Sequence, residues 1–388
     1  MTKITDIPAI RFKGFSDTWE QRKLGEIGSV SMCRRIFKEQ TSENGEIPFY
    51  KIGTFGGEAD AFISRELFEE YKAKYQYPKK GDILISASGI IGRTVVFTGK
   101  NEYFQDSNIV WLNHDKHLDN SFLKCFYSIV KWAGIEGSTI KRLYNDNILN
   151  TAITLPSVEE QQKIGAYFEN LDNLITLHQR KYDKLTNVKK SMLEKMFPQN
   201  GSNVPEIRFK GFTEAWEQRK VSELFKVTRG YVLAATLTEP AKTDEMPYPV
   251  YSSQTKDNGL MGYYKDYLYE DAITWTTDGA NAGTVNYRAG KFYCTNVCGV
   301  LLSNEVTANQ MIAEALNNVA KGYVSYVGNP KLMNNVMADI EIMIPTHAEE
   351  REKLSVFFRN LDTLITLHQR ELEKLKKLKK ACLEKMFV

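Results

Sequence analysis

Few residues in this chain have the types and spacing that catalysis or metal binding requires. Cys294 and Cys298 are separated by three residues, and neither has a His or Cys pair at the distance that a zinc site needs. His114 and His117 are a similarly isolated pair, so no metal site is assigned. The five cysteines have no framework spacing, which is typical of free thiols in a reducing compartment.

Signatures of enzymatic sites are equally incomplete. Gly99-Lys100-Asn101 lacks the Ser or Thr and the upstream glycine of a phosphate-binding loop. Glu70-Tyr71-Lys72 resembles part of a nuclease motif, but triplets of this kind are common by chance. Asn329-Pro330-Lys331 is not the Asn-Pro-Pro-aromatic motif of adenine methyltransferases. With no H-E-x-x-H or G-x-S-x-G motif either, the sequence favours recognition over chemistry.

The composition is that of an ordinary soluble globular protein. Its 388 residues are 42% hydrophobic and 26% charged, enough for two or three domains. No apolar run reaches the roughly 20 residues of a transmembrane helix, and the first residues lack a signal-peptide core. We therefore expect a cytoplasmic protein without a membrane partner. The net charge of +3 is too small to indicate nucleic-acid binding by itself.

The chain contains an internal repeat. Residues 8–23 (PAIRFKGFSDTWEQRK) return at 205–220 as PEIRFKGFTEAWEQRK, and residues 170–180 (NLDNLITLHQR) return at 360–370 as NLDTLITLHQR. The sequences between these copies are only weakly similar to each other. The sequence therefore predicts one architecture used twice, with two different working surfaces.

A long helix is predicted at the end of each repeat. Pro156-Ser157 before Glu159-Glu160 is typical of a helix start, and Pro345-Thr346 before Glu349-Glu350 repeats it. Apolar residues at alternating spacings of four and three predict a coiled-coil seam in each helix. The seam residues are Leu171, Ile175, His178, Tyr182, Leu185, Lys189, Met192 and Met196 in the first helix, and Leu361, Ile365, His368, Leu372, Leu375, Lys379, Cys382 and Met386 in the second.

The matching seams favour antiparallel pairing of the two helices. The alternative is that each helix is amphipathic and lies on its own domain. His178 and His368 are interpreted as residues that fix the register of the pair, because polar seam residues more often do this than catalysis.

Each body between the repeated segments is predicted to be a small mixed α/β domain. Strands are expected at 82–86, 94–97, 109–112, 272–276, 284–287 and 297–302, and helices at 121–132 and 308–319. Gly-rich turns connect them, and residues 81–92 correspond faintly to 271–283.

Polar and basic loop residues of these bodies are candidates for DNA contact. Lys and Arg bind phosphates, while Arg, Asn, Gln and Ser can read base edges. The candidates in the first body are Arg34, Arg35, Lys38, Ser86, Ser88, Arg93, Lys141 and Arg142. Those in the second body are Arg229, Tyr231, Ser252, Ser253, Gln254, Lys256 and Lys331. Any one of them alone fits a solvated surface residue better, so the hypothesis rests on the set.

The repeated segments resemble the specificity (S) subunits of bacterial type I restriction–modification enzymes. The resemblance is carried by IRFKGFSDTWEQRKLGEI at 10–27, LPSVEEQQKIGAYFENLD at 155–172 and their second copies. It covers nearly the whole chain. The second helix start, IPTHAEEREKLSVFFRNLD, departs from the first by one extra residue and the loss of the Gln pair.

The resemblance implies a mixed α+β fold with four segments. Two tandem-repeated α/β target-recognition domains would occupy residues 1–155 and 198–343. Long helical spacers at 156–197 and 344–388 would form an antiparallel coiled coil with pseudo-twofold symmetry.

The resemblance also implies partners. The first body would read the 5′ half of a bipartite double-stranded DNA target, and the second body the 3′ half. The helices would set the spacer and dock methyltransferase (modification) subunits, expected to be two. Those subunits would carry S-adenosylmethionine and methylate adenine, and restriction subunits would add translocation and cleavage with ATP and Mg. This chain would bind none of these cofactors and catalyse nothing.

Two other interpretations stay open on the residues alone. The chain could be a protein–protein scaffold whose bodies bind peptides. It could instead be a standalone nuclease or methyltransferase with a site that no motif reveals. DNA binding by the chain with its methyltransferase partner separates recognition from scaffolding, and methyl transfer by the isolated chain would support the last interpretation.

Overall fold

The computed structural model describes residues 7–132, 141–199, 201–253 and 256–388, and it divides into two compact units. The first unit contains Met1–His178 with Glu371–Val388, and the second contains Gln179–Arg370. Each unit thus combines one body with part of both long helices. The boundaries between the two units fall inside the long helices, at 178/179 and 370/371. The boundaries of the four predicted segments, at 155/156, 197/198 and 343/344, fall instead near the ends of these helices.

The described strands of the first unit are short and form three sheets. Their bounds are β1 Glu20–Lys23, β2 Gly28–Ser31, β3 Ile47–Tyr50, β4 Phe62–Ile63, β5 Ile83–Ser86, β6 Thr94–Val96, β7 Tyr103–Phe104, β8 Ile109–His114 and β9 Ala152–Leu155. β1 pairs with β9, the second sheet has the order β2-β8-β5-β6, and the third has the order β4-β3-β7. Every residue of β5 is buried, so this strand lies at the centre of the unit.

Short helices surround these sheets. Their bounds are α1 Leu24–Ile27, η1 Lys38–Gln40, α2 Arg65–Lys74, α3 Asn120–Ile129 and α4 Asn145–Leu149. The long helix α5 follows at Val158–Met196. The Asp119 carboxylate accepts hydrogen bonds from the backbone N–H groups of Ser121 and Phe122, so it caps α3. The predicted helix at 121–132 ends three residues early in the structure, at Ile129.

The second unit has a larger sheet. Its strands are β10 Glu217–Lys220, β11 Phe225–Arg229, β12 Tyr248–Tyr251, β13 Leu260–Tyr264, β14 Tyr269–Thr276, β15 Val285–Cys294, β16 Cys298–Ser303 and β17 Glu341–Ile344. β10 pairs with β17, and the other strands form one sheet in the order β11-β16-β14-β15-β12-β13. All neighbours are antiparallel except β12 and β15, which are parallel.

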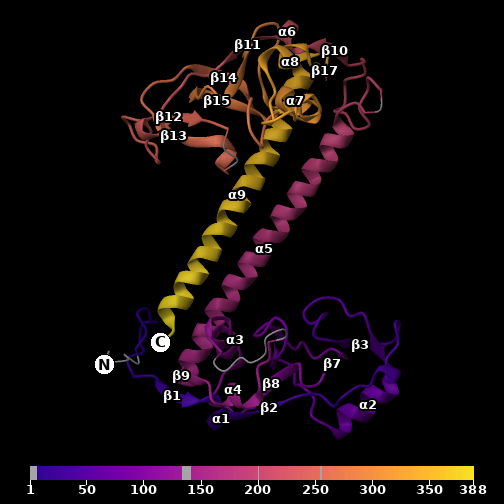
Figure 1. Cartoon of the computed structure of the whole chain (residues 1–388), viewed down its shortest axis with the longest axis vertical. Coiled ribbons are helices and arrows are strands. Elements are labelled where there is room, and N and C mark those ends of the chain that lie inside the picture. The colour runs from indigo at the N-terminus through magenta and orange to yellow at the C-terminus, as the bar shows by residue number, and fades with distance from the viewer. Residues whose placement is uncertain (1–6, 133–140, 200, 254–255) are drawn as a thin grey trace. The chain divides into compact units, whose positions relative to one another are not determined.

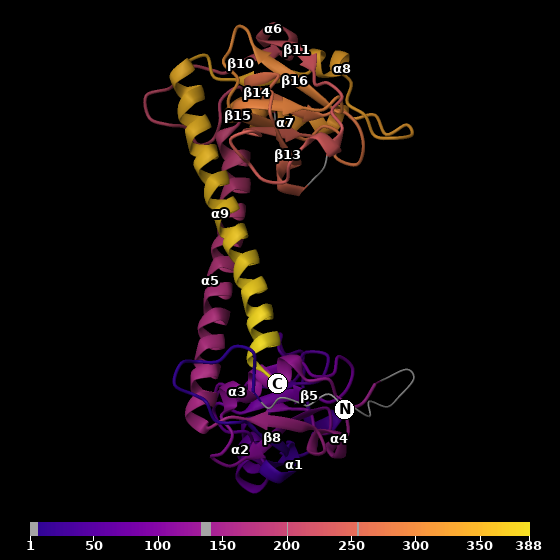
Figure 2. The same cartoon turned by 90° about the vertical axis from the view of Figure 1, so that its left-hand side faces the viewer.

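The described helices of the second unit include a short helix after β10, a helix of 11 residues before β17 and a long helix at the end, but none that corresponds to α2. They are α6 Val221–Leu224, η2 Ala235–Leu237, η3 Lys256–Gly259, α7 Gln310–Ala320, η4 Lys321–Tyr323, α8 Asn334–Asp339 and α9 Ala348–Met386. In Figure 2, α7 lies beside the strand β15. The predicted helix at 308–319 corresponds to α7, whereas β15 continues seven residues beyond the predicted strand at 284–287.

Each repeated entry segment is held to a long helix by a buried ion pair. Arg11 donates two hydrogen bonds to the Glu160 carboxylate at 2.7 and 2.8 Å, and Arg208 donates two to Glu350 at 2.6 and 2.7 Å. The side chains of Glu160 and Glu350 are 0% and 1% exposed. These pairs explain why the entry and helix segments repeat together. If only the Arg or only the Glu of a pair were present, an unpaired charge would be buried in the interior.

The last residues of each long helix pack into the core of the unit formed by the other body. Phe197 follows α5, and its ring centroid lies 5.7 Å from those of both Trp216 and Phe358 in the second unit. Phe387 follows α9 and lies 6.2 Å from Trp19 in the first unit. Each core is therefore completed by the helix of the other repeat.

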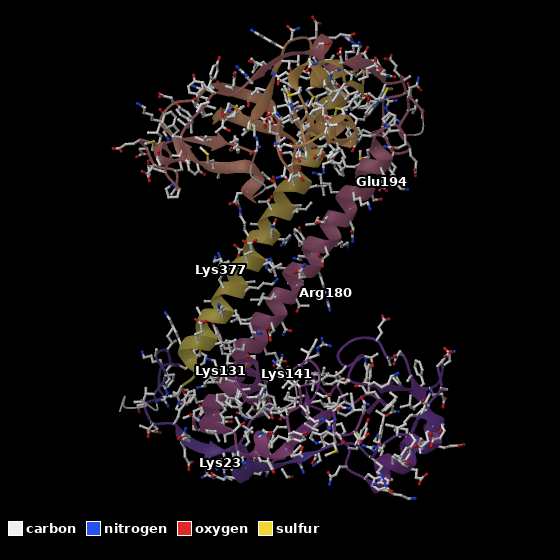
Figure 3. The ribbon with its side chains drawn as sticks, in the orientation of Figure 1. Lys23, Lys131, Lys141, Arg180, Glu194 and Lys377 are labelled. Atoms are coloured by element: carbon white, nitrogen blue, oxygen red, sulfur yellow. The ribbon has the colours of Figure 1, made fainter. Side chains whose placement is uncertain are left out.

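The two long helices lie side by side within each unit (Figure 1). In the first unit the Tyr167 hydroxyl is 3.4 Å from Cys382 Sγ, and Asp172 pairs with Lys379, so the helices run antiparallel. All predicted seam residues are buried or half-buried. Exposed side chains such as Arg180 point outward from the helices (Figure 3). The predicted fold class, mixed domains with long helices packed on each other, is confirmed.

A lysine on each long helix pairs with acidic groups of the unit that receives it. Lys189 Nζ lies 2.6 Å from both Glu314 Oε1 and Asp362 Oδ1 in the second unit. At the equivalent place in the first unit, Asp172 receives both Lys379 and Lys124, the latter at 3.3 Å. The second cluster thus has one cation for two carboxylates, while the first has two cations for one.

This difference predicts unequal effects of replacing the two lysines. Lys189→Met leaves Glu314, whose side chain is 5% exposed, and Asp362 without a cation, and it is expected to destabilise the second unit by about 3 kcal/mol. Lys379→Met is the matched control, because Lys124 still neutralises Asp172. Its expected cost is below about 1 kcal/mol. Hydrogen exchange followed peptide by peptide measures each unit separately; equal losses would contradict this account.

The loss in Lys189→Met should also depend on pH. Burial raises the pKa of Asp362, so the folded protein binds that proton more readily than the unfolded chain does. Such a group contributes stability at low pH, and the contribution is lost as pH rises through the raised pKa. The charge of Lys189 lowers the pKa of Asp362, so the Lys189→Met variant has a higher pKa at Asp362 and a stronger dependence of stability on pH. The deficit of the variant is therefore expected to shrink as the pH is lowered from 7 towards 5, and a constant deficit would show that Asp362 does not cause it.

Candidate nucleic-acid interface

The turn after β5 gathers several predicted contact residues of the first unit. Ser88 donates a hydrogen bond to Asn108 Oδ1 at 2.8 Å, and Arg142 Nη2 donates to the same oxygen at 3.2 Å. Ser86 Oγ accepts the backbone N–H of Arg93 at 2.9 Å and donates to the Ile90 carbonyl. Residues more than 50 positions apart in the sequence therefore meet at one edge of the sheet.

The remaining candidates of the first unit lie at or beyond the rim of this turn. Arg35 is 60% exposed and pairs with Asp106 at 2.9 Å, two residues before Asn108. The Arg34 guanidinium lies 5.2 Å above the Tyr75 ring, away from the turn. Lys38 and Lys141 are exposed, and Figure 3 shows Lys141 at the surface of the unit.

The turn after β14 is the corresponding place in the second unit. Thr277 donates to Asp278 at 2.9 Å, and Lys331 Nζ lies 3.5 Å from the same carboxylate. Asn281 Nδ2 donates to the Ser253 carbonyl at 3.4 Å. Ser253 and Lys331 are thereby each linked to a residue of this turn. Gln254 and the side chain of Lys256 lie outside the described residues.

Arg229 ends β11, and Tyr231 follows it beside the connection between β15 and β16. The backbone N–H of Tyr231 donates to the Cys294 carbonyl at 3.1 Å, and Thr295 Oγ1 donates to Ser252 Oγ at 3.1 Å. A Cβ on Gly230 would lie 2.2 Å from that Cys294 oxygen, so only glycine permits this approach. The Tyr231 side chain is 60% exposed. It is thus available for contact.

The two turns share a backbone framework but not side chains. Ser88 forms an isolated bridge with Arg142, and Asp278 forms the equivalent bridge with Lys331. The next residue donates its N–H to the strand end in both units, at 2.8 Å for Leu143 to Ala87 and 2.9 Å for Leu332 to Thr277. The faint similarity of residues 81–92 and 271–283 therefore reflects one scaffold that presents two different sets of polar groups.

Sequence reasoning missed the residues that organise these turns. Asn108, Asp278 and Asn281 were not among the candidates, although each lies in a polar run next to an apolar strand, which is a signal for a turn. Arg288 was also missed. It is 7% exposed in β15, and its position among alternating residues gives no sign of burial.

Arg288 ties the loop at Lys256–Gly259 to the sheet. Its guanidinium donates to Thr274 Oγ1 at 3.0 Å and to the Asn258 carbonyl at 2.8 Å, and it lies 3.7 Å above the Tyr251 ring. Burial lowers its pKa. Because Asn258 has a positive φ of 54°, the buried arginine holds a strained part of the loop in place.

The described residues offer little for metal binding or nucleophilic chemistry. No group of three His, Cys, Asp or Glu side chains that could hold a metal occurs among them. Burial raises the pKa of the Cys298 thiol to about 11 and that of Cys294 further, so the thiolates that act as nucleophiles are disfavoured. A search of the same residues finds no candidate for a membrane-spanning helix.

The sequence is similar to those of known specificity subunits. A putative type I restriction enzyme specificity subunit of Haemophilus influenzae is 60% identical over 158 residues, which are 40% of this chain and 41% of that protein. The MpnII specificity subunit of Mycoplasma pneumoniae is 32% identical over 158 residues, 40% of this chain and 43% of its own length. The aligned part thus spans less than half of either relative.

The fold is similar to a solved structure over nearly its whole length. The S subunit of a type I restriction–modification system from M. genitalium superimposes with a TM-score of 0.73 at 15% identity, covering 98% of this chain and 99% of that one. The family described as type I restriction modification DNA specificity domain matches residues 16–187 and 213–377. Since these matches cover most of the sequence, the chain belongs to the type I restriction–modification DNA specificity family.

Proposed function

We propose that this chain reads an asymmetric, bipartite DNA target, with the body near residues 15–155 recognising the 5′ half and the body near 212–343 recognising the 3′ half. One observation carries the proposal. The same strand-and-turn framework occurs in both units, yet it presents Ser88, Asn108 and Arg142 in the first and Asp278, Asn281 and Lys331 in the second. Different donors and acceptors match different base edges.

The spacer between the half-sites is proposed to depend on α5 and α9. Each helix has 39 residues and is continuous between the residues that pack in one unit and those that pack in the other. A helix of this length extends about 58 Å. Half-sites read by paired domains lie one or more DNA turns apart, about 34–36 Å per turn. The helices are therefore long enough to act as the spacing element.

A repeated surface supports docking of the same partner twice. Lys163 Nζ lies 4.7 Å from the Phe15 ring in the first unit, and Lys353 Nζ lies 4.8 Å from the Phe212 ring in the second. The second copy borders a shallow groove of about 540 Å³ lined by Phe209, Glu349, Glu352, Lys353, Val356, Phe357 and Asn360. We propose that two methyltransferase subunits bind these surfaces.

Chemistry is assigned to those partners. The proposal places S-adenosylmethionine on the methyltransferase subunits, which would methylate adenine, and places ATP and Mg on restriction subunits. It gives this chain no cofactor and no catalytic step.

The first test replaces an organising residue of one turn. Asn108→Ala removes the oxygen shared by Ser88 and Arg142. In a complex with the methyltransferase partner, binding to the target is expected to weaken about 10- to 100-fold, the usual cost of one or two lost base contacts. The loss should disappear on DNA whose 5′ half is already mutated. A fluorescence titration at fixed salt measures it.

Lys331→Ala is the matched control in the other unit. Its loss should depend on the 3′ half and not on the 5′ half. If either variant weakens binding equally on all DNA sequences, the residue contributes to phosphate binding and not to recognition. If the wild-type complex shows no preference for any sequence, the proposed function itself is wrong.

A further inference from the structure

The loop at residues 325–331 of the second unit has an apolar tip. The side chains of Tyr326 and Val327 are 70% and 93% exposed. The ends of the loop are closed by two backbone hydrogen bonds between Ser325 and Lys331, of 2.8 and 2.9 Å. Gly328, with a φ of +78°, permits the tight turn at the tip. The loop is therefore a closed hairpin that presents two apolar side chains to solvent.

The base of this loop is fixed to the candidate interface. The Gly279 N–H donates to the Pro330 carbonyl at 2.9 Å, directly beside the pair formed by Asp278 and Lys331. The next residue, Leu332, is fully buried, and its carbonyl accepts a hydrogen bond from Trp275 Nε1 at 3.1 Å. The tip consequently projects from the rim of the turn that carries the polar contact residues.

The segment that carries the tip has no acidic residue of its own. Residues 321–338 include Lys321 and Lys331 but no Asp or Glu. Lys331 is paired with Asp278, 3.5 Å away, and the loop itself has no carboxylate that would repel a duplex, whose phosphates flank stacked bases. Side chains inserted between base pairs are typically apolar, and aromatic rings stack on bases. The base of the loop is fixed beside the proposed DNA-contact residues Asp278 and Lys331, and this position favours DNA over a peptide as the partner of the tip.

We propose that Tyr326 and Val327 form an apolar wedge that enters the base stack of the 3′ half-site and opens one base step. Lys331, at the base of the tip, keeps the role in reading the 3′ half that is proposed for it above. The wedge gives the second unit a contribution to specificity through the deformability of that step, in addition to hydrogen bonds to base edges. The inference rests on the proposed DNA-binding function and concerns the second unit alone.

The test uses the full chain in complex with its methyltransferase partner. Duplexes carry a fluorescent base analogue, 2-aminopurine or pyrrolocytosine, at each position of the 3′ half-site in turn. Wild-type complex is expected to raise the fluorescence several-fold at one step other than the adenine that the methyltransferase flips, because the analogue becomes unstacked there. Tyr326→Ala with Val327→Ala is expected to abolish that rise and to weaken binding about 10-fold. Tyr326→Phe should retain the signal.

Leu237→Ala is the matched control. Leu237 is 53% exposed in η2, so its replacement removes a similar exposed apolar group and should change neither signal. Thermal unfolding of the double variant should equal that of wild type, since both side chains are exposed. If wild type binds its target without a fluorescence change at any step, or if the double variant binds and unstacks normally, the wedge is wrong and the proposed function stands.

A second outcome separates the wedge from protein docking. Reduced co-purification of the double variant with the methyltransferase partner would assign the tip to a protein interface and overturn the inference. Absence of sequence-specific binding by the wild-type complex would instead refute the proposed function on which the inference rests.

Discussion

Replacing Phe197 with alanine is expected to destabilise the second unit by about 3–5 kcal/mol, the usual cost of removing a buried phenylalanine. Phe197 is 3% exposed and packs on Trp216 and Phe358, although its helix begins in the first unit. The loss should appear in amides of residues 212–343 and leave those of residues 20–130 unchanged. Hydrogen exchange with mass spectrometry resolves the two sets.

Phe387→Ala is the mirror-image experiment. Phe387 stacks on Phe122 at 5.1 Å, so its replacement should destabilise the first unit, and by less because Phe387 is only half-buried. Leu364→Ala removes an exposed side chain of α9 and should cost less than about 0.5 kcal/mol. Destabilisation spread evenly over both units by Phe197→Ala would contradict the exchange of helix ends described here.

Lengthening both long helices by a heptad is expected to abolish recognition of the native target and create recognition of one with a longer spacer. The insertions belong after Lys181 and after Gln369, which face each other in the antiparallel register set by Lys189 and Asp362. A heptad adds about 10 Å and keeps the seam nearly in phase. Binding to the native target should fall on the order of 10³-fold, the lower end of the usual gap between specific and non-specific DNA.

The measurement is binding to a series of duplexes that keep both half-sites and vary the spacer. The best duplex should have a spacer longer by about one to three base pairs, since stacked base pairs are about 3.4 Å apart. Seven Gly and Ser residues inserted after Gly201, an exposed site between α5 and β10, serve as the control and should leave the optimum unchanged. An unchanged optimum in the heptad variant would refute the role of the helices in spacing.

The scaffold could be predicted from sequence because repetition reports it directly. Two copies of one segment are expected to make the same contacts. The buried pairs Arg11–Glu160 and Arg208–Glu350 are such contacts, because each joins an entry segment to a long helix. The helix starts were also clear, because proline and acidic residues mark them locally. The division into units was not predictable, since where Phe197 and Phe387 pack depends on contacts between distant segments.

The interface could be predicted only in part. Ser88 and Arg142 were recognisable as polar loop residues, but Asn108, which joins them, is an unremarkable turn residue in the sequence. Arg288 was hidden for the opposite reason. A charged residue in a strand is expected to face solvent, and only the sheet order that places Tyr251 and Thr274 around it reveals its burial.

Methylation-site mapping across a genome tests the central claim most directly. The chain and its methyltransferase partner would be expressed in cells without other adenine methyltransferases. The account predicts methylated adenines within one motif made of two unlike defined blocks separated by a fixed stretch of unspecified bases. A palindromic motif, a single uninterrupted block or no sequence preference would contradict it, because two different recognition surfaces would then have no separate targets.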